Sequence, residues 1–300
     1  MAIRIVSAVI GIAVLVGLLI CPYTIVLAIA ASALSAIAVW ELLHNTGKVK
    51  NLVQVIGGMV FSAAGVFLMY WVRKSLTDNL LYMDSDVKQL LLVLMALPIL
   101  YGVYTAVVYL YCGKNMSLND ACYAYLLTLY PTIGFGCMVM LREMMAHGLW
   151  LLILLLMIAW VSDTGAYFVG TFLGKHKMAP VISPKKSWEG FFGGWIISVL
   201  CAYGLFALRF HVDNSYGEGL FYTMYLYLPV VFVLAPLSVV GDLLASLIKR
   251  KCGIKDFGNI MPGHGGVMDR FDSVLFIAPL LYVLAVNATK IMSFIASLIN

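Results

Sequence analysis

The sequence predicts an all-α, polytopic integral membrane protein with about nine transmembrane helices and a cytoplasmic N-terminus. Hydrophobic residues make up 63% of the 300 residues and charged residues only 11%, whereas soluble domains are about one quarter charged. A chain this apolar needs lipid as its solvent, and its backbone polar groups must then be satisfied inside helices. Apolar runs of about 20 residues, the length that crosses a bilayer, recur along the whole chain.

These runs give the expected helices in order. We place them near 3–21, 23–43, 52–72, 88–111, 121–141, 149–173, 191–210, 222–248 and 271–298. Only Cys21, Pro22 and Tyr23 separate the first two runs, which predicts a tight helical hairpin. We interpret the first run as a transmembrane helix and not as a signal peptide, because no small-residue cleavage site follows it.

The positions of lysine and arginine predict the orientation. With the N-terminus inside, thirteen of the 19 basic residues fall in cytoplasmic segments and six outside, which favours this topology. The two most basic loops, 174–190 and 250–270, then both face the cytoplasm. The net charge of +5 is modest, and no segment is long enough to form a basic, water-exposed domain. Nucleic acid is therefore not expected as a partner.

Two carboxylates, Asp163 and Asp242, lie inside apolar runs. A charge at membrane depth costs a few kcal/mol unless it is paired or bound to a metal, and such residues are usually functional. A structural hydrogen bond or an interhelical salt bridge is the alternative for both. Ser246 and Lys249 follow Asp242 on the same helix face, at i+4 and i+7. A carboxylate, a hydroxyl and an ammonium on one stripe favour a site for a metal ion and a phosphate.

The loop before the last apolar run combines basic residues, glycines and acids. Its lysines and arginines can hold phosphates, and Gly265 and Gly266 let backbone N–H groups approach an anion closely. Asp269 and Asp272 open the next helix on one face. Capping of that helix is the alternative role for them. Because the two aspartates lie beside a glycine turn and Arg270, we interpret them as oxygen ligands for Mg²⁺. A ligand set made only of oxygen atoms argues against zinc.

His264 lies in the middle of this glycine turn. We interpret it as a hydrogen-bond donor to phosphate, because no proton needs to be removed when the attacking group is itself a phosphate oxygen. A general base and a residue that shapes the loop remain alternatives.

The other basic loop precedes the seventh apolar run. It gathers four lysines, Lys175, Lys177, Lys185 and Lys186. Binding to lipid headgroups is the alternative for the first two. Ser187 is placed to cap the helix that follows, which begins with Trp188 and Glu189. Gly170 and Gly174 form a GxxxG pattern, which is typical of close helix packing in membranes.

Both loops resemble the signature blocks of the phosphatidate cytidylyltransferases, the CDP-diacylglycerol synthases. The block near the C-terminus carries Ser246, Lys249, Arg250, Lys255, Asp256, Pro262 to Gly266, Asp269, Arg270 and Asp272. Met261 stands where the family usually has Leu, Ile or Phe. The upstream block runs from SDTGAYFVG to KKSWEGFFGG. Together the two blocks cover about 160–275, and the first five helices are similar to the family only in hydropathy.

The resemblance implies that an oxygen of phosphatidic acid attacks the α-phosphorus of CTP, giving CDP-diacylglycerol and pyrophosphate. It implies Mg²⁺, as two ions, with Asp242 and Asp269 as chief ligands and Asp272 and Asp256 in support. It also implies a homodimer in the inner cell membrane, with a polar cavity open to the cytoplasm. We expect residues 146–300 to form the catalytic half and residues 1–145 a scaffold with possible dimer contacts.

The expected site divides into two groups of residues. We place Asp242, Asp269, Asp272, Ser246 and His264 in the catalytic group. The substrate-binding group is Asp163, Lys175, Lys185, Lys186, Ser187, Glu189, Lys249, Arg250, Lys255, Gly265, Gly266 and Arg270. We expect the basic residues of this second group to bind the phosphates. Those that match the family's motifs are Lys185, Lys186, Lys249, Arg250, Lys255 and Arg270.

Three other functions remain open from the sequence. A CTP-dependent polyprenol kinase would transfer the γ-phosphate and release CDP. A cytidylyltransferase for an ether-linked archaeal lipid would differ only in its acceptor. A cation transporter would use Asp163 and Asp242 as an ion path, would turn over no nucleotide, and would leave the glycine loop without a purpose.

Overall fold

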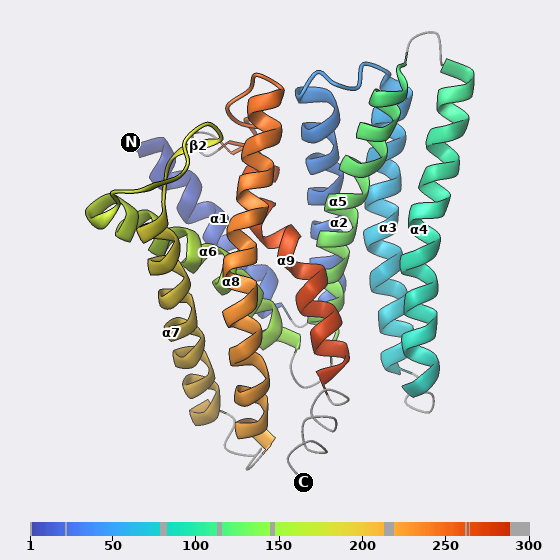
Figure 1. Cartoon of the computed structure of the whole chain (residues 1–300). Coiled ribbons are helices and arrows are strands. Elements are labelled where there is room, and N and C mark those ends of the chain that lie inside the picture. Colours follow the sequence, from blue (N-terminus) through green and yellow to red (C-terminus); the bar gives the residue numbers. More distant parts are fainter. Residues whose placement is uncertain are drawn as a thin grey trace.

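A computed structural model describes residues 2–21, 23–78, 83–112, 116–144, 148–212, 219–261, 263 and 265–288. These residues fold almost entirely into helices (Figure 1), which confirms the predicted all-α membrane class. The helices are α1 (Ala2–Ile20), α2 (Thr24–Trp40), α3 (Leu52–Asp78), α4 (Met83–Cys112), α5 (Leu118–Arg142), α6 (Gly148–Leu173), α7 (Trp188–Val212), α8 (Gly219–Lys251) and α9 (Met268–Val286).

Seven helices among the described residues are long and apolar enough to cross a membrane. The two others that were expected to do so are α1 and α9. The apolar part of α1, Val9–Ile20, is shorter than a full span. The first five residues of α9 include three charged residues, Asp269, Arg270 and Asp272, and the structure describes no residue after 288. The count of about nine spans and the cytoplasmic N-terminus therefore stay predictions.

Helix α9 lies in the middle of the molecule, with α2 to α5 on one side and α6 to α8 on the other (Figure 1). Most of its apolar residues, among them Val274, Ala278 and Leu281, are buried. Because α9 packs against α6 and α8 as well as α5, the charged residues at its start lie near those of α6 and α8.

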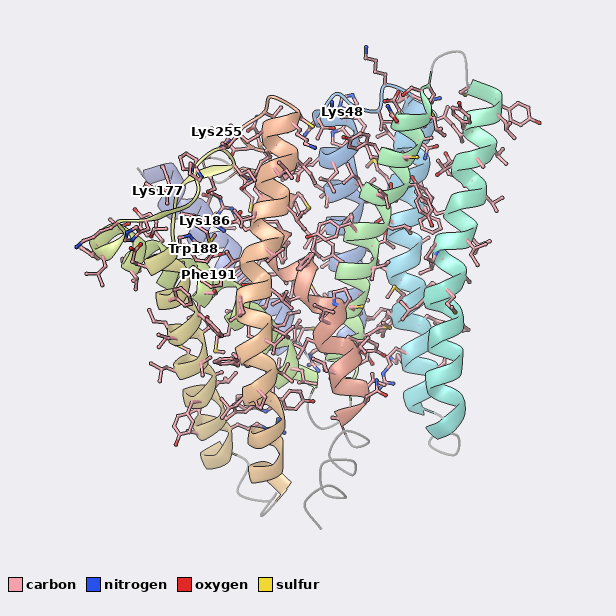
Figure 2. The ribbon with its side chains drawn as sticks, in the orientation of Figure 1. Lys48, Lys177, Lys186, Trp188, Phe191 and Lys255 are labelled. Carbon is pink, nitrogen blue, oxygen red and sulfur yellow. The ribbon has the colours of Figure 1, made fainter. Side chains whose placement is uncertain are left out.

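The loops predicted to face the cytoplasm lie together at one end of the bundle. Figure 2 shows Lys48 between α2 and α3, Lys177 and Lys186 between α6 and α7, and Lys255 between α8 and α9, all near this end. Positive charge gathers at the cytoplasmic end of membrane proteins, so the arrangement is consistent with the predicted orientation.

The segment between α6 and α7 forms a β-hairpin, which the sequence analysis did not predict. Strands β1 (Lys177–Ala179) and β2 (Ser183–Ser187) are antiparallel, with Lys177 paired to Ser187. Ser187 ends the hairpin and caps α7, because its hydroxyl accepts a hydrogen bond from the Gly190 N–H at 3.2 Å. The cap expected from the sequence is therefore formed.

Helices α6 and α7 approach closely through glycine. A Cβ atom on Gly194 would lie 2.3 Å from the carbonyl oxygen of Ser162, and one on Gly190 would lie 2.6 Å from that of Ala166. Directly after α6, a Cβ on Gly174 would lie 2.5 Å from Ser187 Oγ. These contacts agree with helix packing as the role of the GxxxG pattern, and they fix the hairpin against α6.

Candidate functional site

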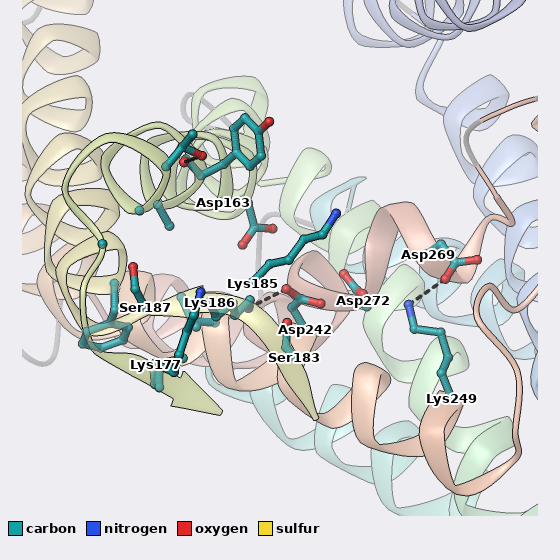
Figure 3. A pocket seen from close by; sticks show the side chains of 18 residues that line it. Asp163, Lys177, Ser183, Lys185, Lys186, Ser187, Asp242, Lys249, Asp269 and Asp272 are labelled. Atoms are coloured by element: carbon teal, nitrogen blue, oxygen red, sulfur yellow. Dashed lines mark hydrogen bonds and ion pairs between the residues drawn. The ribbon is translucent and has the colours of Figure 1, made fainter. Parts of the chain in front are cut away.

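A polar cavity of about 690 Å³ lies beside the hairpin (Figure 3). Its wall is built from α6, the hairpin, the first turn of α7, α8 and the first two turns of α9. Four carboxylates and four lysines line it, namely Asp163, Asp242, Asp269, Asp272, Lys177, Lys185, Lys186 and Lys249. The two basic loops and the membrane carboxylates singled out in the sequence therefore meet in one place.

Three of the carboxylates come from three different helices. Asp163 lies on α6, Asp242 on α8 and Asp272 on α9, and both Asp163 and Asp272 lie close enough to Asp242 to repel its charge. Ser273 connects two of them, because its hydroxyl is 3.2 Å from Asp163 Oδ2 and 3.4 Å from Asp272 Oδ1. A cluster of negative charge at membrane depth needs positive charge beside it.

Part of that positive charge is Lys186, at the end of β2. Its Nζ lies 2.5 Å from Asp242 Oδ2, and Ser246 Oγ lies 3.4 Å from the other oxygen of Asp242. Both partners of the ion pair are largely shielded from solvent, with 20% and 25% of their side chains exposed. Lys177 and Lys185 also line the cavity and are exposed, so they present positive charge to a ligand in solution.

Asp269 holds the glycine loop together. Its Oδ1 accepts from Lys249 Nζ at 2.8 Å, and its Oδ2 accepts from the N–H groups of Phe257 at 2.8 Å and Gly266 at 3.0 Å. The turn that precedes Gly266 needs glycine, since Gly265 has a φ of +91°, a backbone conformation in which a side chain is strained. Asp269 is therefore part of the cavity wall and also the internal anchor of the loop.

The donor set of the cavity fits a hard divalent cation such as Mg²⁺, because carboxylate and hydroxyl oxygens are its preferred protein ligands. Lys186 supplies to Asp242 the positive charge that a cation would otherwise give. Within the described residues, no group of three or more Asp, Glu, His or Cys side chains is arranged to hold one ion. The chemistry of the residues fits the expected metal, and the identity of its ligands stays a prediction.

Several expected site residues lie outside the cavity lining. Lys175, Arg250, Lys255, Asp256 and Arg270 are exposed and do not line the cavity, and Ser246, Glu189, Gly265 and Gly266 are also absent from its wall. His264 lies outside the residues that the structure describes, as does Pro262.

Some of these residues have clear contacts of another kind. Glu189 Oε1 lies 2.6 Å from His176 Nδ1, so it joins the start of α7 to the hairpin. Arg250 Nε donates to the carbonyl oxygen of Ile182 at 3.4 Å, which ties α8 to the hairpin turn. In this structure both residues support the hairpin and do not reach into the cavity.

Sequence reasoning missed Glu41 and Asn45, which lie in a π-helical turn, Glu41–Asn45, at the end of α2. Glu41 is fully buried and accepts hydrogen bonds from the backbone at the start of α9. Applied to Glu41, the rule that singled out Asp163 and Asp242 would have found it, because it too is a carboxylate inside an expected apolar run, 23–43. The pocket-lining residues Tyr167, Thr171 and Ser183 gave no such signal.

A second hollow, apolar and of about 670 Å³, adjoins the polar cavity between α7 and α8. Met178, Phe191 and Val239 line both. On its wall, Trp195 Nε1 donates to the carbonyl oxygen of Phe232 at 2.9 Å. Pro236 has no N–H with which to bond that carbonyl, so the indole satisfies the free oxygen and fixes α7 to α8.

The chain is similar to known proteins over most of its length. The sequence model described as the Cytidylyltransferase family matches residues 2–287. Three relatives carry the name phosphatidate cytidylyltransferase. The protein of Staphylococcus epidermidis is 41% identical over 180 residues, 60% of this chain and 65% of the relative. Those of Staphylococcus saprophyticus and Staphylococcus aureus are 38% identical with the same coverage. The matched region thus spans slightly less than two thirds of each relative.

Proposed function

Since this chain belongs to the Cytidylyltransferase family, as the resemblance of its two loops implied, we propose that it transfers a cytidylyl group from CTP to phosphatidic acid. In this reaction a phosphate oxygen of phosphatidic acid forms a bond to the α-phosphorus of CTP. The bond from that phosphorus to the oxygen leading to the β-phosphorus breaks, and pyrophosphate leaves with the electron pair. The products are CDP-diacylglycerol and pyrophosphate.

The observation that carries this proposal is the contact between the charged cavity and the apolar hollow. Phosphatidic acid has a charged phosphate and two apolar chains, so it needs both environments next to each other. Met178, Phe191 and Val239 form the boundary that the two hollows share. Aromatic residues on the apolar side, Trp188 and Trp195 among them, offer a surface against which acyl chains can pack.

Phosphoryl and nucleotidyl transfer depend on positioning and charge neutralisation more than on a protein nucleophile. In our proposal the exposed Lys177 and Lys185 receive the triphosphate of CTP at the mouth of the cavity. Lys186 pairs with Asp242 at the cavity wall, so it neutralises the carboxylate and also faces a bound phosphate. Asp269 keeps the glycine loop and Lys249 in place.

A divalent cation is part of the proposal. Four lysines already face four carboxylates in the cavity, so a bound triphosphate brings negative charge that the protein alone does not balance. We assign the binding of Mg²⁺ to Asp242, with Asp163, Asp272 and Asp269 around it. When bound, Mg²⁺ neutralises charge on the phosphates and orients them. The homodimer implied by the family resemblance is likewise a proposal, to be tested by the mass of the purified protein in detergent.

The direct test is turnover by the purified protein in neutral detergent, with phosphatidic acid and each of CTP, ATP, GTP and UTP in turn. We expect release of pyrophosphate with CTP and formation of CDP-diacylglycerol. Release of CDP with a polyprenol acceptor would support the kinase instead. Absence of nucleotide turnover with every lipid acceptor would contradict the proposal.

The lysines of the hairpin loop allow a matched comparison. Lys185 lines the cavity and Lys175 does not, although both are exposed and lie ten residues apart in one basic loop. We expect Lys185→Gln to reduce kcat/KM for CTP roughly ten- to a hundredfold, the effect of losing one charge-assisted phosphate contact. Lys175→Gln should change it by about twofold or less, as is usual for exposed charges. Steady-state kinetics with CTP varied at fixed phosphatidic acid measure both. Equal losses in the two variants would show that the loop acts only through its overall charge.

The proposed cytoplasmic orientation of the cavity predicts which side of the membrane the hairpin faces. In a variant without the native cysteines, a cysteine at Ser183 should resist a membrane-impermeant thiol reagent added to intact cells. It should react once the membrane is permeabilised, because Ser183 lies at the start of β2 and is partly exposed. Labelling in intact cells would place the cavity on the outer side and contradict the topology drawn from the lysines.

A further inference from the structure

Glu41 is a carboxylate that is fully buried, with 0% of the residue exposed. Buried carboxylates require hydrogen-bond donors or a cation. Within the described residues, Glu41 takes part in no ion pair with lysine, arginine or histidine. Its donors are two backbone groups, the N–H of Val267 at 3.0 Å from Oε1 and the N–H of Met268 at 2.8 Å from Oε2. Glu41 thus binds the start of α9, although 226 positions in the sequence separate it from Val267.

This contact replaces the usual cap of a helix. The first N–H groups of a helix have no partner within it, and an anion there is also stabilised by the helix dipole. Val267, the N-cap of α9, makes no side-chain capping bond of its own. The carboxylate that caps α9 therefore comes from the π-helical turn that follows α2.

Two glycines leave the space that the carboxylate fills. A Cβ atom on Gly258 would lie 2.3 Å from Glu41 Oε1, and one on Gly266 would lie 2.4 Å from the same oxygen. Neither glycine has a positive φ. At these two positions the close approach of Glu41, and not the backbone conformation, is what excludes a side chain.

Asn45, at the end of the same π-helical turn, holds the other end of the loop. Its Nδ2 donates to the carbonyl oxygen of Phe257 at 2.8 Å, while the N–H of Phe257 donates to Asp269 Oδ2 at 2.8 Å. The loop between α8 and α9 is therefore fixed from both sides, by Asp269 from within and by the π-helical turn of α2 from outside. Such turns occur frequently at functional sites.

We propose that Glu41 is a positioning residue for the transfer reaction. Its carboxylate holds the start of α9, the helix that places Asp269 and Asp272 at the cavity wall. Glu41 itself does not line the cavity, so it acts through α9 and not on the substrates. This inference rests on the proposed function for its effect on turnover, but the holding of α9 can be measured without any substrate.

The first test is hydrogen exchange of the full-length protein in detergent, which reports local opening. We expect Glu41→Ala to speed exchange of the amides at 265–271 by about tenfold or more, with a smaller increase in Glu41→Gln, which keeps one acceptor oxygen. The hairpin, 177–187, should be unchanged because Glu41 does not touch it. Ser35→Ala is the matched control, since Ser35 is a buried residue of α2 that bonds Ser62 and not the loop. Unchanged exchange at 265–271, or an equal increase throughout the protein, would overturn the proposal.

The second test is turnover. We expect kcat to fall by about tenfold in Glu41→Gln and about a hundredfold in Glu41→Ala, with KM for CTP changed by about twofold or less, because the hairpin lysines are not moved. Gly258→Ala should behave like Glu41→Ala, whereas Gly204→Ala should behave like the wild type, since a Cβ at Gly204 meets nothing within 4 Å.

The outcomes separate this inference from the proposed function. Faster exchange at 265–271 with unchanged turnover would leave Glu41 as a helix cap and overturn its role in the reaction. A wild-type protein that turns over no CTP would contradict the proposed function, and hydrogen exchange would still decide whether Glu41 holds α9.

Discussion

Asp242→Asn is expected to reduce kcat/KM for CTP at least about a hundredfold, which is about 2.7 kcal/mol of transition-state stabilisation. Asp242 lies at the centre of the cavity, where its carboxylate pairs with Lys186 at 2.5 Å and faces Asp163 and Asp272. The change to asparagine keeps the size of the side chain and removes the charge that Lys186 and a divalent cation require. The protein should still insert and purify, because Asp242 lies at the wall of a cavity and is partly exposed, outside the packed core.

A double variant shows in which way Asp242 acts. If its only role is to neutralise Lys186, then Asp242→Asn combined with Lys186→Gln should recover turnover relative to Asp242→Asn alone. If Asp242 takes part in binding Mg²⁺ and phosphate, the double variant should stay at least as impaired. Asp120→Asn, in the capping box at the start of α5, is the control for the chemical change. Retention of more than about a tenth of the wild-type rate by Asp242→Asn would remove the residue from the reaction.

Much of the fold could be predicted from the sequence because one physical requirement dominates it. In lipid a backbone must satisfy its own hydrogen bonds, so apolar runs become helices whatever their neighbours are. The seventh run, expected near 191–210, is Trp188–Val212 in the structure, and the sixth, expected near 149–173, is Gly148–Leu173. The β-hairpin was not predicted, because strands of three and five residues in a polar loop carry no alternating pattern.

The carboxylates in apolar runs could be predicted as site residues for a similar reason. A charge in an apolar run has a high cost and therefore draws attention without any knowledge of the fold. The residues that pair with these carboxylates could not be predicted, because the pairing depends on tertiary structure. Lys186 was predicted to bind phosphate, and the structure also pairs it with Asp242. Asp256 was predicted to support the metal from its place in the motif, but its side chain is exposed and does not line the cavity.

Glu41 shows the limit of reading a signature block alone. The block contains the glycines at 258 and 266, and the residue that requires them lies in the π-helical turn after α2, in the half of the chain where the two signature blocks give no information. From the sequence, the N-terminal helices were expected to be a scaffold. The contacts of Glu41 and Asn45 with the loop give α2 a direct part in building the site.

Asp269→Asn is expected to abolish turnover as well, but by a different route from Asp242→Asn. Asp269 accepts three hydrogen bonds, from Lys249 and from the N–H groups of Phe257 and Gly266. Asparagine has one acceptor oxygen in place of two, and its NH₂ group would face a donor. Lys249, whose side chain is only 12% exposed, would lose its counter-ion, and a buried pair broken on one side costs about 3–5 kcal/mol.

Hydrogen exchange and thermal unfolding in detergent distinguish the two routes. Asp269→Asn should lower the unfolding temperature and speed exchange at the loop amides of 257 and 266, whereas Asp242→Asn should be inactive with the loop unchanged. Replacing Lys249 by Met in the Asp269→Asn background removes the unpaired charge and should restore part of the stability, because an apolar residue tolerates burial where a lone ammonium does not. It should not restore turnover, since the charges of Asp269 and Lys249 are then both missing from the cavity wall. An Asp269→Asn protein that keeps wild-type stability and loop exchange but has no activity would show that Asp269 acts on the substrates or the metal and does not serve as the anchor of the loop.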